Sequence, residues 1–295
     1  SIADAVEGAF QIPKLWVGVA VAVFAGIVIF GGLRSIVRFA ELVVPLMAAI
    51  YVLAALAIVV LHITEVPGVL AMIVKSAFGI SEATGGVAGS VTAAALNGIK
   101  RGLFSNEAGM GSAPNIAATA TPMPHHPSSQ GLVQAFGVFV DTLVICTATA
   151  LMILLAGVVE PGSGITGTKL TQDAMAFHFG AFGNYFIAIA IFFFAFTSIV
   201  ANYSYAENAL YHLGGGTKLG VTILRLVALA MVVWGGYEAV TTVFNFADAS
   251  MGLMATVNLI AIVLLSGTVV KLTKDYMAQR KAGKSPRFAA KDYPE

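Results

Sequence analysis

Polar and charged residues gather in one glycine-rich stretch of an otherwise apolar chain. The stretch spans residues 97–115 and reads NGIKRGLFSNEAGMGSAPN. Its glycines and its proline allow a helix to break, and a broken helix exposes main-chain N–H groups on one side and carbonyl groups on the other. The N–H side attracts a carboxylate and the carbonyl side attracts a cation. The stretch therefore predicts a site for a zwitterionic solute and an accompanying ion.

Within this stretch, the main chain around residues 104–111 is expected to bind the charged ends of the solute. The predicted substrate-binding residues here are Phe104, Ser105, Asn106, Glu107, Gly109 and Gly111. Glu107 has two interpretations, because a charge at membrane depth is a functional hypothesis by default. It carries a proton or a sodium ion, or it is a structural partner of Arg101 or of loop N–H groups.

A second polar constellation, FAFTSIVANYSYAEN, occupies the apolar run 184–206 and the residues just beyond it. Thr197 and Ser198 are adjacent hydroxyls, and neutral oxygens suit a hard cation such as sodium. The same hydroxyls have an ordinary interpretation, since Ser and Thr in membrane helices often donate to carbonyls one turn earlier. Ser198 and Asn202, one turn apart, are predicted to line the substrate side. Asp141, early in the run 130–156, is either an intramembrane charge tied to the broken helix or an interfacial residue.

The elements that position these residues are long apolar segments. Of the 295 residues, 58% are hydrophobic and only 11% are charged, whereas a soluble domain carries about 25% charged residues. Six runs come near the length that spans a bilayer: 15–32, 41–61, 130–156, 184–206, 219–234 and 251–270. Their uniform apolarity favours helices over barrel strands. The composition predicts an all-α polytopic membrane protein and excludes a cytosolic enzyme and a nucleic-acid binder.

Basic residues near the ends of these runs predict the orientation. The tail 271–295 carries seven basic residues and is placed in the cytoplasm, while the loop 158–182 has only Lys169 and falls outside. This alternation requires residues 88–119 to cross the membrane once, as a broken helix. The alternative is a cytoplasmic loop in which Lys100 and Arg101 are ordinary inside charges and a neighbouring span is re-entrant.

The expected organisation has three parts. Residues 1–11 look like the end of a transmembrane helix that began upstream, so we expect a fragment. Residues 12–270 form a transporter domain of about seven spans, one of them discontinuous, and residues 271–295 form a charged cytoplasmic tail. Two other function classes remain open: an ion channel with the break as its filter, and an intramembrane hydrolase with Ser105 or Ser112 as nucleophile. The hydrolase needs a nearby base, and no histidine lies within a predicted span.

The segments GIKRGLFSNEAGMGSAPNIAATA and QGLVQAFGVFVDTLVICTATALMILLAG resemble the alanine/glycine:cation symporter family. IVIFGGLRSIVRFAELVVPLMAAIY and FAFTSIVANYSYAEN are also similar to that family's pattern, and the resemblance covers residues 1–270. It implies sodium-coupled (sometimes proton-coupled) symport of alanine or glycine by alternating access, in a multi-pass protein of the bacterial inner membrane. It implies no cofactor beyond the co-transported sodium ion and no nucleic-acid partner.

The resemblance also implies a fold of the leucine-transporter type, with two inverted five-helix repeats. Residues 1–10 then correspond to the end of the third core helix and residues 88–119 to the broken sixth. The chain is thereby expected to be an N-terminally truncated member whose missing N-terminal helices are its partner, and to transport nothing alone. The eighth helix of this fold type supplies a hydroxyl pair to sodium, which implies a sodium site at Thr197 and Ser198. Many members have tryptophan where Asn202 stands, which implies a wider and more polar pocket here.

Overall fold

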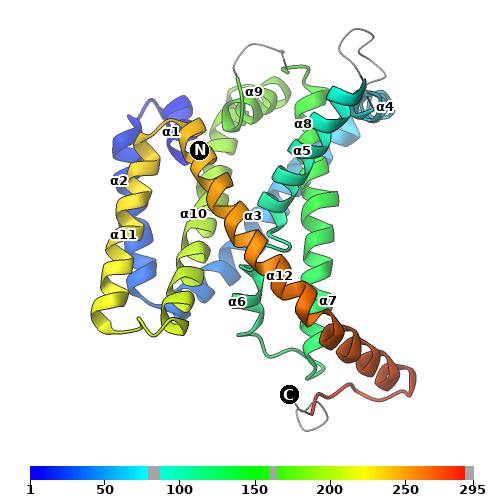
Figure 1. The fold of residues 1–295 in the computed structure, drawn as a ribbon. Coiled ribbons are helices and arrows are strands. Elements are labelled where there is room, and N and C mark those ends of the chain that lie inside the picture. Colours follow the sequence, from blue (N-terminus) through cyan, green and yellow to red (C-terminus); the bar gives the residue numbers. More distant parts are fainter. Residues whose placement is uncertain (79–86, 160–164, 290–295) are drawn as a thin grey trace. The chain divides into compact units, whose positions relative to one another are not determined.

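A computed structural model describes residues 1–78, 87–159 and 165–289, and within these ranges every regular element is a helix. Figure 1 shows their order along the chain. Two parts of the expectations lie outside the described residues. They are part of the loop 158–182 (residues 160–164) and the end of the tail with Lys291.

The helices of the described residues are α1 (Ile2–Phe10), α2 (Lys14–Phe30), α3 (Leu33–Leu61), α4 (Val66–Ala77), α5 (Val87–Asn106), α6 (Ala113–Ala117), α7 (Pro127–Phe139), a π-helix (Val140–Cys146), α8 (Thr147–Leu155), α9 (Thr168–Phe179), α10 (Ala181–His212), α11 (Lys218–Tyr237) and α12 (Val240–Lys281).

Among the residues that the structure describes, five helical segments are long and apolar enough to cross a membrane. They are Arg38–Leu61, Pro127–Leu155, Ala181–His212, Lys218–Tyr237 and Val240–Lys281. Each overlaps one of the predicted runs, so the prediction of a polytopic, all-helical membrane protein is confirmed. The first run, 15–32, forms α2, which is apolar but has 17 residues. α5 is not among these segments, so the crossing by residues 88–119 stays a prediction.

The predicted break lies in the C-terminal half of the glycine-rich stretch. α5 continues through Lys100 and Arg101 to Asn106, and six residues, 107–112, separate it from the five-residue α6. Lys, Arg, Leu and Phe keep helical geometry easily around the single Gly102, so the first half of the stretch stays helical. Gly109 and Gly111 follow the end of the helix, within the break.

One helix was missed by sequence reasoning. The outer loop 158–182 contains α9, whose apolar pattern is weak. Gly180, with φ +63°, ends α9 and leads directly into α10. A Cβ at Gly183 would lie 2.2 Å from the carbonyl oxygen of Met175, so the two helices approach too closely for any side chain there. The buried Gln172 of α9 donates to the carbonyl of Ala5 (3.0 Å) and ties α9 to α1.

The chain forms two compact units. The first comprises Ser1–Ala95 and Ile145–Asn245. Its largest contact joins α2 and α11, which lie side by side in Figure 1. Gly18 of α2 and Gly236 of α11 make this close approach possible: a Cβ on Gly236 would lie 2.8 Å from the Cα of Gly18. Small residues allow membrane helices to pack backbone against backbone.

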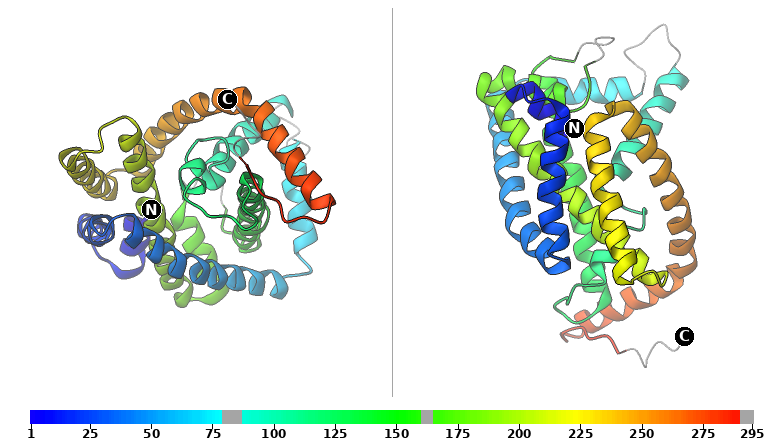
Figure 2. Two further views of the ribbon diagram at one scale, coloured as in Figure 1. Left: turned by 90° about the horizontal axis from the view of Figure 1, so that it is seen from below. Right: turned by 90° about the vertical axis from the view of Figure 1, so that its left-hand side faces the viewer.

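The second unit comprises Leu96–Val144 and Phe246–Glu295. Its C-terminal segment turns back after α12, as Figure 2 shows in dark red. The amide of Phe288 donates to the carbonyl of His125 (2.9 Å). His126, only 1% exposed, accepts from the Ser128 amide with Nδ1 and lies 3.3 Å from Asp275 with Nε2. Since a neutral imidazole carries one N–H, this arrangement places the proton on Nε2, which donates to the carboxylate.

The α2–α11 contact is testable with neighbouring glycines. Gly236→Ala inserts a methyl group into the helix contact and is expected to lower stability by about 1–3 kcal/mol through overpacking. Gly235→Ala, whose added Cβ meets nothing within 4 Å, is expected to leave stability unchanged or raise it slightly. Thermal melting of the purified protein in detergent measures both. Equal melting temperatures for the two variants would contradict the close packing.

Candidate functional site

The break between α5 and α6 is defined by three residues with positive φ. They are Glu107 (+54°), Gly109 (+82°) and Gly111 (+89°). The Glu107 amide still donates to Leu103 (3.0 Å) and closes the last turn of α5, and the Met110 amide donates back to the Glu107 carbonyl (3.1 Å). The chain then leaves helical geometry. Left-handed backbone is strained for residues with a Cβ, so glycines at 109 and 111 avoid that cost at two of the three positions, while Glu107 bears it.

Asn258 of α12 contacts this loop and fixes one of its main-chain groups. Its Nδ2 donates to the carbonyl of Gly109 at 2.9 Å. A Cβ on Gly111 would lie 3.1 Å from Asn258 Cβ and Cγ and 3.2 Å from its Oδ1. The asparagine thus crowds the position that a Cβ at residue 111 would take. Gly111 is favoured both by its φ and by this contact.

The last turn of α5 is fixed to the π-helix. Ser105 Oγ donates to Asp141 Oδ2 at 2.6 Å, and Asn106 Nδ2 donates to Thr142 Oγ1 at 2.9 Å. Asn106 Oδ1 also accepts from the Ala108 amide (2.9 Å) at the start of the break. π-helical turns occur frequently at functional sites because they alter which side chains face a partner. Here the π-turn presents Asp141 and Thr142 together to the end of α5.

Asp141 is an acidic residue within the apolar segment Pro127–Leu155. Its bond to Ser105 ties it to the broken helix, which is the first of the two interpretations drawn from the sequence. Arg101 pairs with Asp248 of α12 at 2.7 Å. Asp248 is thus one partner of Arg101, and both interpretations of Glu107 stay predictions.

The predicted sodium-binding hydroxyls lie on α10, in the first unit. Thr197 Oγ1 and Ser198 Oγ both donate to the carbonyl of Phe194, at 2.9 and 3.0 Å. Asn202 Nδ2 donates to the Ser198 carbonyl at 2.9 Å. These are the local helix bonds of the ordinary interpretation. A donating hydroxyl keeps its oxygen lone pairs, so the same geometry is compatible with a cation, and the sodium site stays a prediction.

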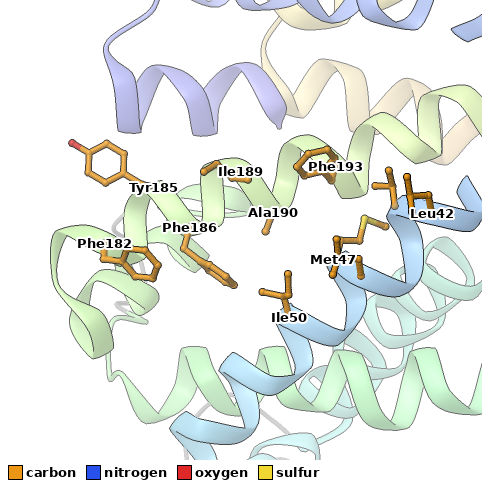
Figure 3. A pocket seen from close by; sticks show the side chains of 11 residues that line it. Leu42, Met47, Ile50, Phe182, Tyr185, Phe186, Ile189, Ala190 and Phe193 are labelled. Carbon is orange, nitrogen blue, oxygen red and sulfur yellow. The ribbon is translucent and has the colours of Figure 1, made fainter. Parts of the chain in front are cut away.

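An apolar pocket of about 360 Å³ lies between α3 and α10 in the same unit. Figure 3 shows Met47 and Ile50 of α3 and Ile189 and Phe193 of α10 around it. Tyr185 supplies the one polar side-chain group among its lining residues. A zwitterion needs charged or polar partners, so this pocket is not the predicted solute site. Among the described residues, no three His, Cys, Asp or Glu side chains are grouped to hold a metal ion.

Sequence reasoning missed Asn258 of α12. Asn258 was hidden because a single amide in the run 251–270 carries no motif of its own. The available signal was its presence as a polar residue in an otherwise apolar helix, where polar side chains mark helix–helix hydrogen bonds. The predicted residues Phe104 to Gly111 do lie together at the break, whereas Ser198 and Asn202 lie in the first unit.

Comparisons with known proteins show similarity to transporters. The profile described as "Sodium:alanine symporter family" matches residues 1–290. The chain is 47% identical over 294 residues to the amino-acid carrier protein AlsT of Bacillus subtilis, which covers the whole chain and 61% of that relative. It is 46% identical over 288 residues to the probable sodium/glutamine symporter GlnT of Bacillus subtilis, covering 98% of the chain and 59% of the relative.

A third relative is the sodium/proton-dependent alanine carrier protein of Bacillus sp. strain PS3. It is 44% identical over 308 residues, covering 99% of the chain and 68% of the relative. Against the first two relatives, the chain spans about three-fifths of their length.

The need for glycine at position 111 can be tested by comparing its substitution with that of Gly102, a glycine within α5. Gly111→Ala is expected to lower stability by about 1–3 kcal/mol, because alanine is strained at this φ and its methyl group meets Asn258. Gly102→Ala is the control, since its Cβ would meet nothing within 4 Å. Thermal melting of both variants measures the difference. A Gly111→Ala protein as stable as Gly102→Ala would mean that the loop does not have this geometry.

Proposed function

Because the chain belongs to the sodium:alanine symporter family, we propose that it takes part in the sodium-coupled symport of a small neutral amino acid, alanine or glycine. The relatives are transporters rather than enzymes, and the hydrolase alternative is set aside on that ground. The proposed mechanism is alternating access, in which sodium and amino acid both favour one closed state. A ligand shifts a conformational equilibrium only by its differential affinity for the states.

The observation that carries the proposal is the break at residues 107–112 and the way it is held. The loop is uncoiled, yet it is fixed by Asn258 on one side and connected through Ser105 and Asn106 to the π-helix. A preorganised uncoiled segment in a transporter supplies main-chain groups for a zwitterionic solute. A fixed loop also binds with a smaller entropy cost than a mobile one. The proposed substrate residues here are Phe104, Ser105, Asn106, Glu107, Gly109 and Gly111.

The proposed fold is of the leucine-transporter type with two inverted repeats, in which residues 88–119 form the broken sixth helix. Support comes from the broken α5–α6 pair and from the five apolar segments. The proposed location is the bacterial inner membrane, and the support for it is that the named relatives are bacterial proteins. Thr197 and Ser198 are the proposed sodium ligands, with Ser198 and Asn202 on the substrate side.

The names of the relatives differ in both the substrate and the coupled ion, so experiments must decide these for this chain. One is named for alanine with sodium and protons, and another for glutamine with sodium. For this chain we propose a small substrate and sodium, while Asp141 and Glu107 are the acidic residues near the break that a proton would use. An ion channel is the second function class, and it differs in a measurable way because a symporter saturates with substrate.

The proposal is tested by uptake of radiolabelled L-alanine into proteoliposomes, with protein expressed from its natural gene. An inward sodium gradient is expected to drive saturable uptake, and an equal potassium gradient is not. Thr197→Val is expected to raise the half-saturating sodium concentration by about tenfold or more, because it removes one ligand oxygen. Thr222→Val is the control, since Thr222 bonds Lys218 on α11 in the same local way.

The outcomes separate the alternatives. If uptake depends on sodium but Thr197→Val has the same half-saturating sodium concentration as the wild type, the sodium site at Thr197 is contradicted. The proposal of sodium-coupled symport is not affected by that result. Current that rises without saturation and needs no amino acid would contradict symport and favour the channel.

A further inference from the structure

The positive charge of the chain is concentrated in the tail that follows the last apolar run. Residues 271–295 carry seven basic and three acidic side chains, whereas the other 270 residues carry nine basic and twelve acidic ones. Six of the seven basic residues are described by the structure, and all six are exposed: Lys271, Lys274, Arg280, Lys281, Lys284 and Arg287. None of the six forms an ion pair with another described residue.

One face of the end of α12 is packed against its own unit. A helix turns by about 100° per residue, which places Asp275, Tyr276 and Gln279 together on one side. Tyr276 is buried, and its ring centroid lies 5.3 Å from that of His126. Gln279 Nε2 donates to Asp275 Oδ2 at 2.9 Å. Asp275 is the one acidic residue among residues 271–289, so the negative charge of this segment is engaged on the packed face.

The opposite face of the same turns carries basic and apolar side chains. The helical rotation places Lys274, Met277 and Lys281 together, away from the packed side. All three are exposed, Met277 at 60%. Figure 2 shows α12 curving before this end, so that its last turns (red) leave the direction of the turns before them. Cations combined with an exposed apolar side chain are typical of a helix that lies at the boundary between lipid headgroups and acyl chains.

The segment after α12 is folded back and fixed, which holds its cations in place. Gln279 pairs with the main chain of Arg287 in both directions: its Nε2 donates to the carbonyl at 3.0 Å, and its Oε1 accepts from the amide at 2.9 Å. The amide of Lys284 donates to the Gln279 carbonyl at 3.0 Å, and Pro286 is buried. Lys284 and Arg287 are therefore held beside the end of α12. Charges that only orient a chain during insertion need no such fixed placement.

These observations define the chemistry of the partner. Exposed cations without an ion-pair partner among the described residues attract anions, and the cations of residues 271–287 directly follow the apolar run 251–270. A basic cluster next to a membrane-spanning helix is the arrangement that attracts anionic lipids. A phospholipid also offers acyl chains to Met277, which a soluble polyanion does not. Charge and apolarity together favour an anionic bilayer surface.

We propose that residues 271–289, the end of α12 and the segment folded back beside it, bind the headgroups of anionic phospholipids at the membrane surface. The phosphates pair with the exposed lysines and arginines, and Met277 enters the acyl boundary beneath them. The proposal goes beyond the proposed function and does not depend on its substrate or its ion. It assigns the tail a partner, the lipid surface, in addition to its charge.

The test titrates the purified protein in a neutral detergent with phosphatidylglycerol and follows the melting temperature, which rises when a ligand binds the folded state. Phosphatidylglycerol is expected to raise it, and the zwitterionic phosphatidylcholine is not. Lys274→Gln, Lys281→Gln and Lys284→Gln, combined in one protein, are expected to raise the half-saturating phosphatidylglycerol concentration about 10- to 100-fold. The matched control, Lys274→Arg, Lys281→Arg and Lys284→Arg, keeps the charge and is expected to keep wild-type affinity.

Three outcomes of this titration overturn the proposal. Wild-type phosphatidylglycerol affinity in the glutamine variant would mean that the tail is not the binding surface. Equal stabilisation by phosphatidylcholine would mean that acyl chains, rather than anionic headgroups, are recognised. An equal loss of affinity in the arginine variant would mean that positive charge is not what binds.

Two measurements on the wild type keep the proposal falsifiable if the glutamine variant does not fold. Raising potassium chloride from about 0.05 M to about 0.5 M is expected to weaken phosphatidylglycerol binding, because salt screens exposed charges. Binding that does not change with salt overturns the proposal. Glycerol 3-phosphate, a soluble phosphate of similar chemistry, is expected to leave the melting temperature unchanged at the same concentration. Equal stabilisation by it would indicate a site for free phosphate compounds and overturn the assignment to a lipid surface.

Discussion

The hydrogen bond from Asn258 to the carbonyl of Gly109 is the interaction on which the rest of the site depends. An uncoiled segment in an apolar environment must satisfy its main-chain groups within the protein. Asn258 satisfies one of them at 2.9 Å and at the same time disfavours a side chain at Gly111, because a Cβ there would lie 3.1 Å from it. One side chain therefore fixes both the conformation of the loop and the set of main-chain groups that stay available.

The neighbouring polar contacts extend this constraint along α5. Ser105 and Asn106 connect the end of the helix to Asp141 and Thr142, and Arg101 pairs with Asp248. Charged groups in an apolar segment are costly unless they are paired or functional. The pairing of Arg101 accounts for one charge of the stretch structurally, which concentrates the functional question on the loop itself and on Asp141.

Much of the fold followed from composition and glycine spacing. Apolar runs near 20 residues predict membrane helices because hydrocarbon thickness sets their length, and the break was predicted because glycines cluster after Asn106. The limits of the break were not predictable, since helix propensity at Lys100 and Arg101 competes with the glycines. α9 was not predicted because contacts with α1 and α10 stabilise it, and its sequence has only a weak apolar periodicity. Asn258 escaped because its role depends on a partner far away in the sequence.

The central claim is that the segment 107–112 binds the solute through its main-chain groups. Hydrogen–deuterium exchange of this segment tests it most directly, since it reports the amides of Gly109, Gly111 and Ser112 themselves. With L-alanine and sodium together, exchange of these amides is predicted to slow relative to alanine with potassium. Unchanged exchange in this segment, at an alanine concentration that saturates the protein, would contradict the account.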